Sequence, residues 1–154
     1  MFLLLRLLHL LGVIMFVGNI VTAALWKVRA DASGDLHAIA YAQRGVMFAD
    51  YAFTAPGAAL ILITGLWMAN LTHRNILQTG WLFTALILLV VALLVWLFEL
   101  LPVQRRLIRV ADEAVHTGQL DPAFKALTLR WTIFGIIATL LPLVNIYLMV
   151  FKPF

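Results

Sequence analysis

Residues 4–30 read LLRLLHLLGVIMFVGNIVTAALWKVRA, and this stretch decides the fold class. Its apolar run continues to Trp26, long enough for a helix to cross roughly 30 Å of hydrocarbon at about 1.5 Å per residue. A cleaved signal peptide has a shorter apolar region, and no strong A-x-A cleavage site precedes a soluble domain here. The stretch therefore predicts a retained first membrane span.

The composition of the whole chain predicts the same class. Of its 154 residues, 64% are hydrophobic and 12% are charged, whereas a soluble globular protein has about 25% charged residues. The net charge of +4 does not indicate nucleic-acid binding, because the basic residues cluster in connecting segments, where they set membrane orientation. The chain has no cysteine, which excludes disulfides and thiolate metal sites. We expect an integral membrane protein in contact with the lipid bilayer.

Four apolar stretches are long enough to span the bilayer, over residues 2–26, 46–69, 80–101 and 131–150. We expect one domain over residues 1–154, an all-α integral membrane four-helix bundle. Gly34 with Asp35, and Gly118 with Asp121 and Pro122, have the chemistry of helix ends and helix starts. Apolar residues recur at helical spacing after the third span. The helices are therefore expected to extend past the membrane into the cytoplasm.

The basic residues predict the orientation of the bundle. The first and third connections carry eight Lys and Arg residues, and the other side carries three. By the positive-inside rule, these two connections face the cytoplasm and both termini face outward. Trp26 and Trp131 then lie at the inner membrane boundary, and Trp67 and Trp81 lie at the outer one, as in an aromatic belt.

One histidine lies inside the first span. His9, Gly12, Phe16 and Asn19 fall on one side of the helix, within about a quarter turn. Small and polar residues on one stripe favour a helix–helix interface, so we expect the imidazole to face the bundle interior, where a haem or a metal ion can be held. The alternative is a histidine that bonds to a neighbouring helix or faces the headgroups.

The second span has a small-residue face of its own. Gly57, Thr64 and Gly65 lie on it, and such residues allow the close approach of another helix or of a flat cofactor. Close helix packing is the simpler explanation. Pro56 permits a kink in this span, and Pro142 predicts one in the fourth.

Two acidic residues, Asp50 and Glu99, are expected near the inner ends of the second and third spans. Each has the chemistry of a proton-binding group or of a quinone contact. The simpler expectation is that each pairs with a nearby cation, because charged groups within membranes are usually paired. Arg44, Arg105 and Arg106 are the candidate partners.

Five fragments carry a family resemblance across nearly the whole chain. They read LLHLLGVIMFVG, FTAPGAALILITGLWMA, GWLFTALILLV, LPVQRRL and MVFKPF. Together they resemble a small bacterial integral-membrane family of unknown function. More distantly, the chain is similar to the HemJ-type protoporphyrinogen oxidases and to the copper-resistance protein D group. The resemblance implies a multi-pass protein of the bacterial inner membrane, with periplasmic termini if the charge pattern holds.

The HemJ-type resemblance implies a bundle that binds haem b, with a first-span histidine as the proposed ligand. His9 is at that position, which implies a metal-ligating role for it. Two departures argue against protoporphyrinogen oxidation and leave haem binding open. Thr84 stands where the HemJ type has a functional lysine, and acidic Asp50 stands where the relatives tend to be basic. Met15, Met68 and His73 are weak candidates for a second axial ligand.

Three functional hypotheses remain. The first is a haem b protein for electron transfer or haem-related redox chemistry, with a candidate cofactor-binding set of His9, Gly12, Phe16, Asn19, Gly57 and Thr64. The second is a cofactor-free accessory subunit that packs against itself as a homo-oligomer or against a larger membrane complex. The third is copper transport. Phosphate loops, nucleophile elbows and HExxH motifs do not occur, so the sequence does not identify an enzyme.

Overall fold

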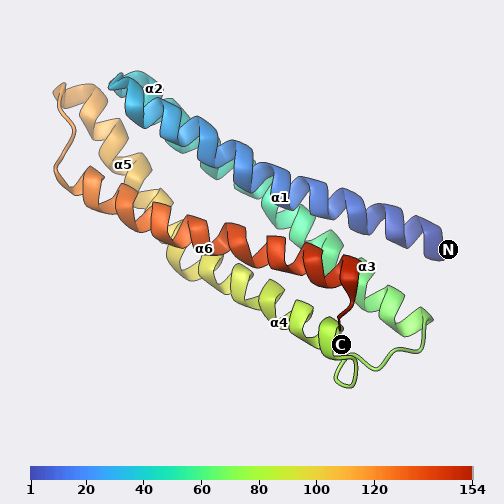
Figure 1. The fold of residues 1–154 in the computed structure, drawn as a ribbon. Coiled ribbons are helices and arrows are strands. Elements are labelled where there is room, and N and C mark those ends of the chain that lie inside the picture. The colour runs from blue at the N-terminus through green and yellow to red at the C-terminus, as the bar shows by residue number, and fades with distance from the viewer. Residues whose placement is uncertain (154) are drawn as a thin grey trace.

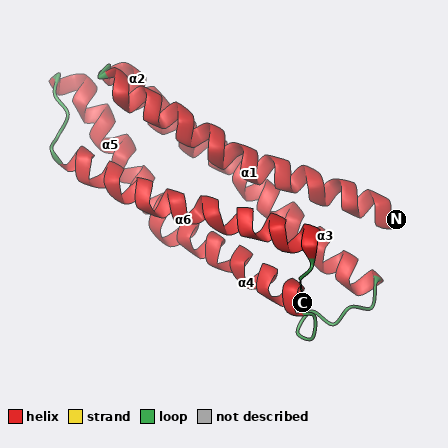
Figure 2. Cartoon of the chain, viewed as in Figure 1, coloured by secondary structure: helices red, strands yellow, loops and turns green. Residues whose placement is uncertain are grey.

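A computed structural model describes residues 1–153 as four long helical rods that lie side by side (Figure 1), with no strand among them (Figure 2). The predicted all-α four-helix bundle is confirmed. The first rod is α1 (Phe2–Ser33) and the fourth is α6 (Ala123–Phe151). Each middle rod joins two α-helices through a π-helical segment: α2 (Leu36–Ala49), η1 (Asp50–Thr54) and α3 (Ala55–Leu71), then α4 (Gly80–Val95), η2 (Trp96–Leu100) and α5 (Leu101–Thr117).

The rods run alternately up and down, so the bundle has two distinct ends. Both termini and the 72–79 loop lie at one end, the terminal end, and the turns at 34–35 and 118–122 lie at the other, the turn end (Figure 1). Gly34 and Gly118 end their helices at φ 70° and 75°, where glycine is favoured. Asp35 caps α2 through two backbone N–H groups, and Asp121 accepts from the first N–H of α6. These predicted helix boundaries are confirmed.

Each π-helical segment is followed, two residues later, by a proline. Pro56 and Pro102 have no N–H and crowd the carbonyl four residues back, so the regular hydrogen-bond ladder opens there. The residues before them, Ala55 and Leu101, donate instead to the carbonyl five residues back. Such wide turns often mark functional sites. The fourth rod, by contrast, continues as α-helix through Pro142.

Helix packing differs between the two ends of the bundle. At the turn end, α1, α2, α5 and α6 contact one another in a closed ring, around a core that includes Ile39, Leu107, Ala111 and Trp131. At the terminal end, α3 packs on α1 and α4 packs on α6, but the backbones of α3 and α4 do not approach closely. The bundle is therefore well packed at the turn end and divides into two helix pairs at the terminal end.

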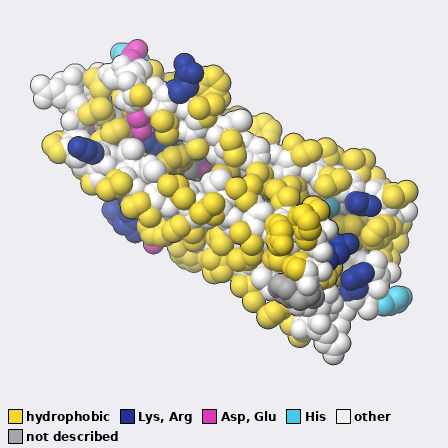
Figure 3. Space-filling model, viewed as in Figure 1, with side chains coloured by type: hydrophobic (Ala, Val, Ile, Leu, Met, Phe, Trp, Pro, Cys, Tyr) yellow, Lys and Arg dark blue, Asp and Glu magenta, His cyan; other side chains and the backbone are white. Residues whose placement is uncertain are grey.

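The surface is that of a protein surrounded by lipid. Hydrophobic side chains cover the middle of the bundle, while the charged side chains gather toward its ends (Figure 3). All four rods are long and apolar enough to cross a membrane. Soluble monomers rarely expose apolar patches larger than a few hundred Å². At the turn end, α2 begins at Leu36, α5 runs to Thr117 and α6 begins at Ala123, so these helices reach beyond the predicted spans, as expected.

Candidate functional site

His9 lies half-buried on α1, at the terminal end, and faces α3. Its Nδ1 is 2.9 Å from the hydroxyl oxygen of Thr64. That hydroxyl donates its own hydrogen to the carbonyl oxygen of Leu60, so the hydrogen between the two side chains belongs to His9 Nδ1. The free lone pair is therefore on Nε2. Metal-binding histidines are commonly oriented in this way, with the second ring N–H held by a neighbouring group.

Gly12 and Gly57 lie where α1 and α3 meet backbone to backbone. A Cβ on Gly12 would stand 2.9 Å from the carbonyl oxygen of Gly57, and a Cβ on Gly57 would stand 2.9 Å from that of Gly12. These two predicted site residues therefore serve close helix packing, and no flat group fits between them. Phe16 is buried one turn beyond Gly12 and lines both of the cavities described below.

A cavity of about 240 Å³ lies between the two helix pairs at the terminal end, and His9 forms part of its wall. The wall is otherwise apolar except for Asn145, whose buried Oδ1 has no hydrogen-bond partner among residues 1–153. Met15, Met68 and His73, the candidates for a second axial ligand, do not line this cavity. Met149 of α6 does line it. Sequence reasoning missed Met149 because only the fold brings the last turn of α6 to the cavity of His9.

The terminal end carries positive charge without acidic side chains. Arg6, Arg74 and Lys152 lie there, whereas the Asp and Glu residues of the described chain are at positions 31, 35, 50, 99, 112, 113 and 121, none of them in the first turns of α1, the 72–79 loop or the last turns of α6. Arg74 and Lys152, from distant parts of the chain, approach the same Trp81 ring, at 5.9 and 5.6 Å from its centroid. None of the three cations belongs to an ion pair within residues 1–153. An electropositive rim therefore lies near the cavity of His9.

Asp50 is the centre of a second polar site, deeper in the bundle. It is the first residue of η1 and is only 5% exposed. Asn19 and Thr54 donate to its Oδ1 at 3.0 and 2.9 Å, and Trp96 and Gln104 donate to its Oδ2 at 3.2 and 2.8 Å. An ionised carboxylate only accepts hydrogen bonds, so four donors suit its two oxygens. All four donors are neutral, so none of them balances its charge.

The expectation that Asp50 pairs with an arginine is wrong. Arg44 pairs with Asp112, and Arg105 donates to the hydroxyl of Tyr51 at 3.4 Å. Both arginines lie on helix faces that point away from the interior, whereas the π-helical turn directs the carboxylate of Asp50 inward. The three ion pairs within residues 1–153 do not include Asp50.

Glu99 does pair with a cation, but its partner is Arg130, at 2.6 Å, and not one of the arginines expected. Asn19 was expected on the stripe of His9. It is on that helix, but its amide donates to Asp50 and Thr54. The structure therefore divides the predicted site residues between two places. One sequence signal pointed to the site around Asp50. A proline follows each π-helical segment two residues later, Pro56 in the second rod and Pro102 in the third.

A cavity of about 320 Å³ lies beside Asp50, and the side chains of Gln104 and Trp131 also line it. Gln104 Oε1 and Trp131 Nε1 are buried without a hydrogen-bond partner in the part of the chain that the structure describes. A buried polar atom without a partner costs about 1–3 kcal/mol. Neither atom has accessible surface, so neither is exposed to the cavity as it stands.

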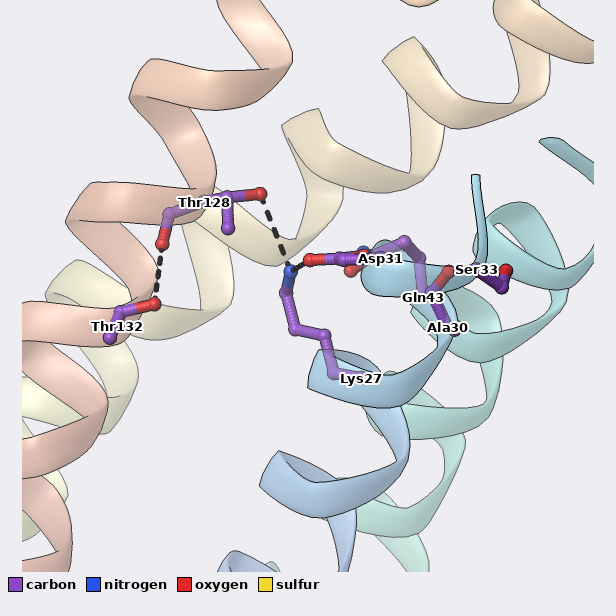
Figure 4. A network of polar contacts seen from close by, with 7 residues as sticks. All are labelled: Lys27, Ala30, Asp31, Ser33, Gln43, Thr128 and Thr132. Atoms are coloured by element: carbon purple, nitrogen blue, oxygen red, sulfur yellow. Dashed lines mark hydrogen bonds and ion pairs between the residues drawn. The ribbon is translucent and has the colours of Figure 1, made fainter. Parts of the chain in front are cut away.

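A third buried polar group lies closer to the turn end. Lys27 is 1% exposed, and its ammonium is 2.5 Å from Asp31 and 3.4 Å from the Thr128 hydroxyl (Figure 4). Gln43 donates to the other oxygen of Asp31 at 3.2 Å. The ammonium also lies 5.0 Å from the centroid of the Trp131 ring. Lys27 was counted among the connecting residues, but it ties α1, α2 and α6 together as a compensated ion pair.

With this geometry established, comparison with known proteins assigns the family. A family model described as "Predicted integral membrane protein (DUF2269)" matches residues 3–153. The chain belongs to this family. No curated protein and no solved structure matches the chain. The membrane family of unknown function is thereby confirmed for this DUF2269 protein, whereas a similarity to the HemJ-type oxidases or to copper-resistance protein D is not shown.

Proposed function

We propose that this membrane protein holds haem b at its terminal end, with His9 as an axial ligand, for electron transfer. The observation that carries the proposal is the orientation of the imidazole. With the Thr64 hydroxyl donating to Leu60, Nδ1 carries the hydrogen of the His9–Thr64 bond, and Nε2 keeps a lone pair that could bind iron. Histidine is a frequent axial ligand of haem iron, and the group that holds its second nitrogen tunes the iron.

The surroundings of His9 suit a large apolar cofactor. The cavity of about 240 Å³ is smaller than the roughly 300–1,000 Å³ of most ligand pockets. However, the backbones of α3 and α4 do not approach closely, and the cavity opens toward the lipid at Leu10, Leu66 and Val150, which are exposed. A macrocycle can therefore lie between the two helix pairs with an edge in the hydrocarbon.

The charges near the cavity suit the same cofactor. Haem b carries two propionates, and Arg6, Arg74 and Lys152, which form no ion pair within residues 1–153, can bind carboxylates. Met149 lines the cavity together with His9 and has a thioether that can serve as a second ligand. When bound, haem b supplies one-electron chemistry, while the apolar walls exclude water and Thr64 holds the imidazole.

The proposal includes a location in the bacterial inner membrane. The turn end, which holds most of the basic residues, would face the cytoplasm, and the terminal end would face the periplasm. The haem would then lie in the outer half of the bilayer.

The visible absorption spectrum of the purified, haem-supplied protein tests the proposal. We expect a Soret band that is lost in His9→Ala and retained in the matched control His116→Ala, which removes an exposed histidine at the turn end. Thr64→Val keeps the shape of Thr64 but not its hydroxyl, and we expect it to weaken haem affinity about ten- to hundredfold. A Soret band that survives His9→Ala unchanged would contradict the assignment.

The other two hypotheses have less support. The described residues hold no group of three or more His, Cys, Asp or Glu side chains that could bind a metal ion, so no such group supports copper transport. A blank spectrum together with co-purification of a larger membrane complex would favour the accessory-subunit hypothesis instead.

A further inference from the structure

We propose that the cavity beside Asp50 is a binding site for a lipophilic organic monocation, such as an ammonium group with apolar substituents. The first argument is charge. Asp50 is buried among apolar helices, and its four hydrogen-bond donors are neutral. A charge in the hydrocarbon region is costly unless it is paired. The cavity beside Asp50 has room for the missing positive charge, since its volume is about 320 Å³.

The chemistry of the walls selects an organic cation over a metal ion. The donors already occupy both carboxylate oxygens of Asp50, and Gln104 Oε1, which lacks a partner within residues 1–153, has no accessible surface and is not exposed to the cavity as it stands. A hard metal cation requires about six oxygen ligands. An organic cation needs fewer, because the field of a carboxylate acts over several ångströms in a medium of low dielectric.

Two tryptophans complete the site. Trp96 and Trp131 both line the cavity, and indole faces attract cations, most strongly where water is excluded. The ring of Trp131 already shows this affinity, because the Lys27 ammonium lies 5.0 Å from its centroid. Lys27 does not line the cavity and is paired with Asp31, so it leaves the charge of Asp50 unbalanced.

The opening of the cavity indicates the route of entry. The exposed residues of its wall are Val28 on α1 and Ile136 and Leu140 on α6, and all three are apolar. The cavity is therefore reached from the lipid between α1 and α6. A ligand that enters this way must be soluble in the bilayer, which agrees with apolar substituents around the charge. The proposal does not depend on haem binding, because it concerns a different cavity and different residues.

Equilibrium dialysis of the protein in neutral detergent micelles tests the proposal, with protein-free micelles as the blank. The probe is benzyltrimethylammonium, and the control ligand is neopentylbenzene, which has the same shape without the charge. We expect saturable binding of the cation and at least tenfold weaker binding of the neutral compound. Equal affinities would overturn the proposal and identify a site for neutral ligands.

The variants separate charge from shape. Asp50→Asn removes the charge with little change of size, and we expect a loss of at least tenfold in affinity for the cation. Glu99→Gln is its matched control, since it removes one carboxylate charge from the other π-helical segment, outside the cavity. We expect that control to bind as the natural protein does. Equal losses in both variants would contradict a specific role for Asp50.

A second variant covers the case in which Asp50→Asn does not fold. Gly135 lines the cavity, and a Cβ there would meet no atom within 4 Å. Gly135→Leu therefore adds a side chain at the wall of the cavity, at a position with room for its Cβ, and we expect it to abolish binding of the probe. Gly18→Leu, also in open space but away from the cavity, is the control. Unchanged binding to Gly135→Leu, or no saturable binding to the folded natural protein, would overturn the proposal.

Discussion

The first residues of the two π-helical segments, Asp50 and Trp96, are joined by a hydrogen bond of 3.2 Å from the indole Nε1 to the carboxylate Oδ2. The two wide turns therefore meet in the bundle interior, although 46 residues separate them. Each turn is imposed by a proline shortly after it, and each places a polar side chain on the inner side of its rod. The pair joins the second rod to the third at the boundary between the closed and the divided halves of the bundle.

The Asp50 network is expected to contribute measurably to stability. Thr54 accepts a hydrogen bond from Asn19 and donates one to Asp50. Thr54→Val keeps the shape and removes both bonds, so we expect a loss of about 1–3 kcal/mol in the free energy of unfolding. Denaturant unfolding in detergent measures the change. Thr117→Val, at an exposed helix end, should change it by less than about 0.5 kcal/mol, and a similar loss in both variants would argue against the network.

The contact between α1 and α3 is expected to tolerate no side chain at Gly12. The new Cβ of Gly12→Ala would stand 2.9 Å from both the Gly57 carbonyl oxygen and the Leu60 Cβ. The helices must then separate, which we expect to cost about 1–3 kcal/mol. Gly18→Ala in the same helix meets nothing within 4 Å and should be neutral or stabilising, because alanine favours helix. Thermal unfolding of the two variants distinguishes a packing requirement from a general effect of glycine.

The buried pair of Lys27 and Asp31 is expected to be strongly coupled. Lys27→Met leaves the Asp31 carboxylate without its cation, and loss of one partner of a buried pair costs about 3–5 kcal/mol. Because Asp31 is partly exposed, we expect the lower part of that range. Adding Asp31→Leu removes the remaining charge and should restore part of the stability. A double-mutant cycle on unfolding free energies gives the coupling, and additive losses would show that the two side chains act independently.

The proposed orientation can be tested directly because the chain has no cysteine. Gln119→Cys at the turn end and Gln78→Cys at the terminal end are matched, since both replace exposed glutamines in connections. In intact cells, a thiol reagent that does not cross the inner membrane should label Gln78→Cys and not Gln119→Cys. The reverse pattern would place the terminal end in the cytoplasm.

The sequence predicted the fold well because the signals involved are local. An apolar run long enough to cross the bilayer, an aspartate before Leu36 and a glycine after Thr117 each act within one helix. The same local rules put His9 and Thr64 on helix faces suited to close packing, and the hydrogen bond between them agrees with the alternative given for His9, a bond to a neighbouring helix.

The Asp50 site was not predictable in the same way. Asp50, Gln104 and Trp96 come from two rods, and regular helical spacing does not align them, because each wide turn shifts the register of the helix after it. The rule that a charge in a membrane has a cation partner then favoured Arg44, Arg105 and Arg106, but Arg44 pairs with Asp112 and Arg105 donates to Tyr51. Met149 was missed because spacing within one helix does not show which other helix its side chain faces. Its position beside the cavity of His9 depends on how α6 packs in the bundle.

The division of the terminal half into two helix pairs has a mechanical consequence. Any molecule that enters between α1–α3 and α4–α6 displaces acyl chains around the pairs and leaves the tightly packed turn end undisturbed. Separating the two helix pairs then requires work against the lateral pressure of the bilayer. The thickness and fluidity of the membrane would therefore affect the affinity of a ligand between the pairs as much as the side chains do.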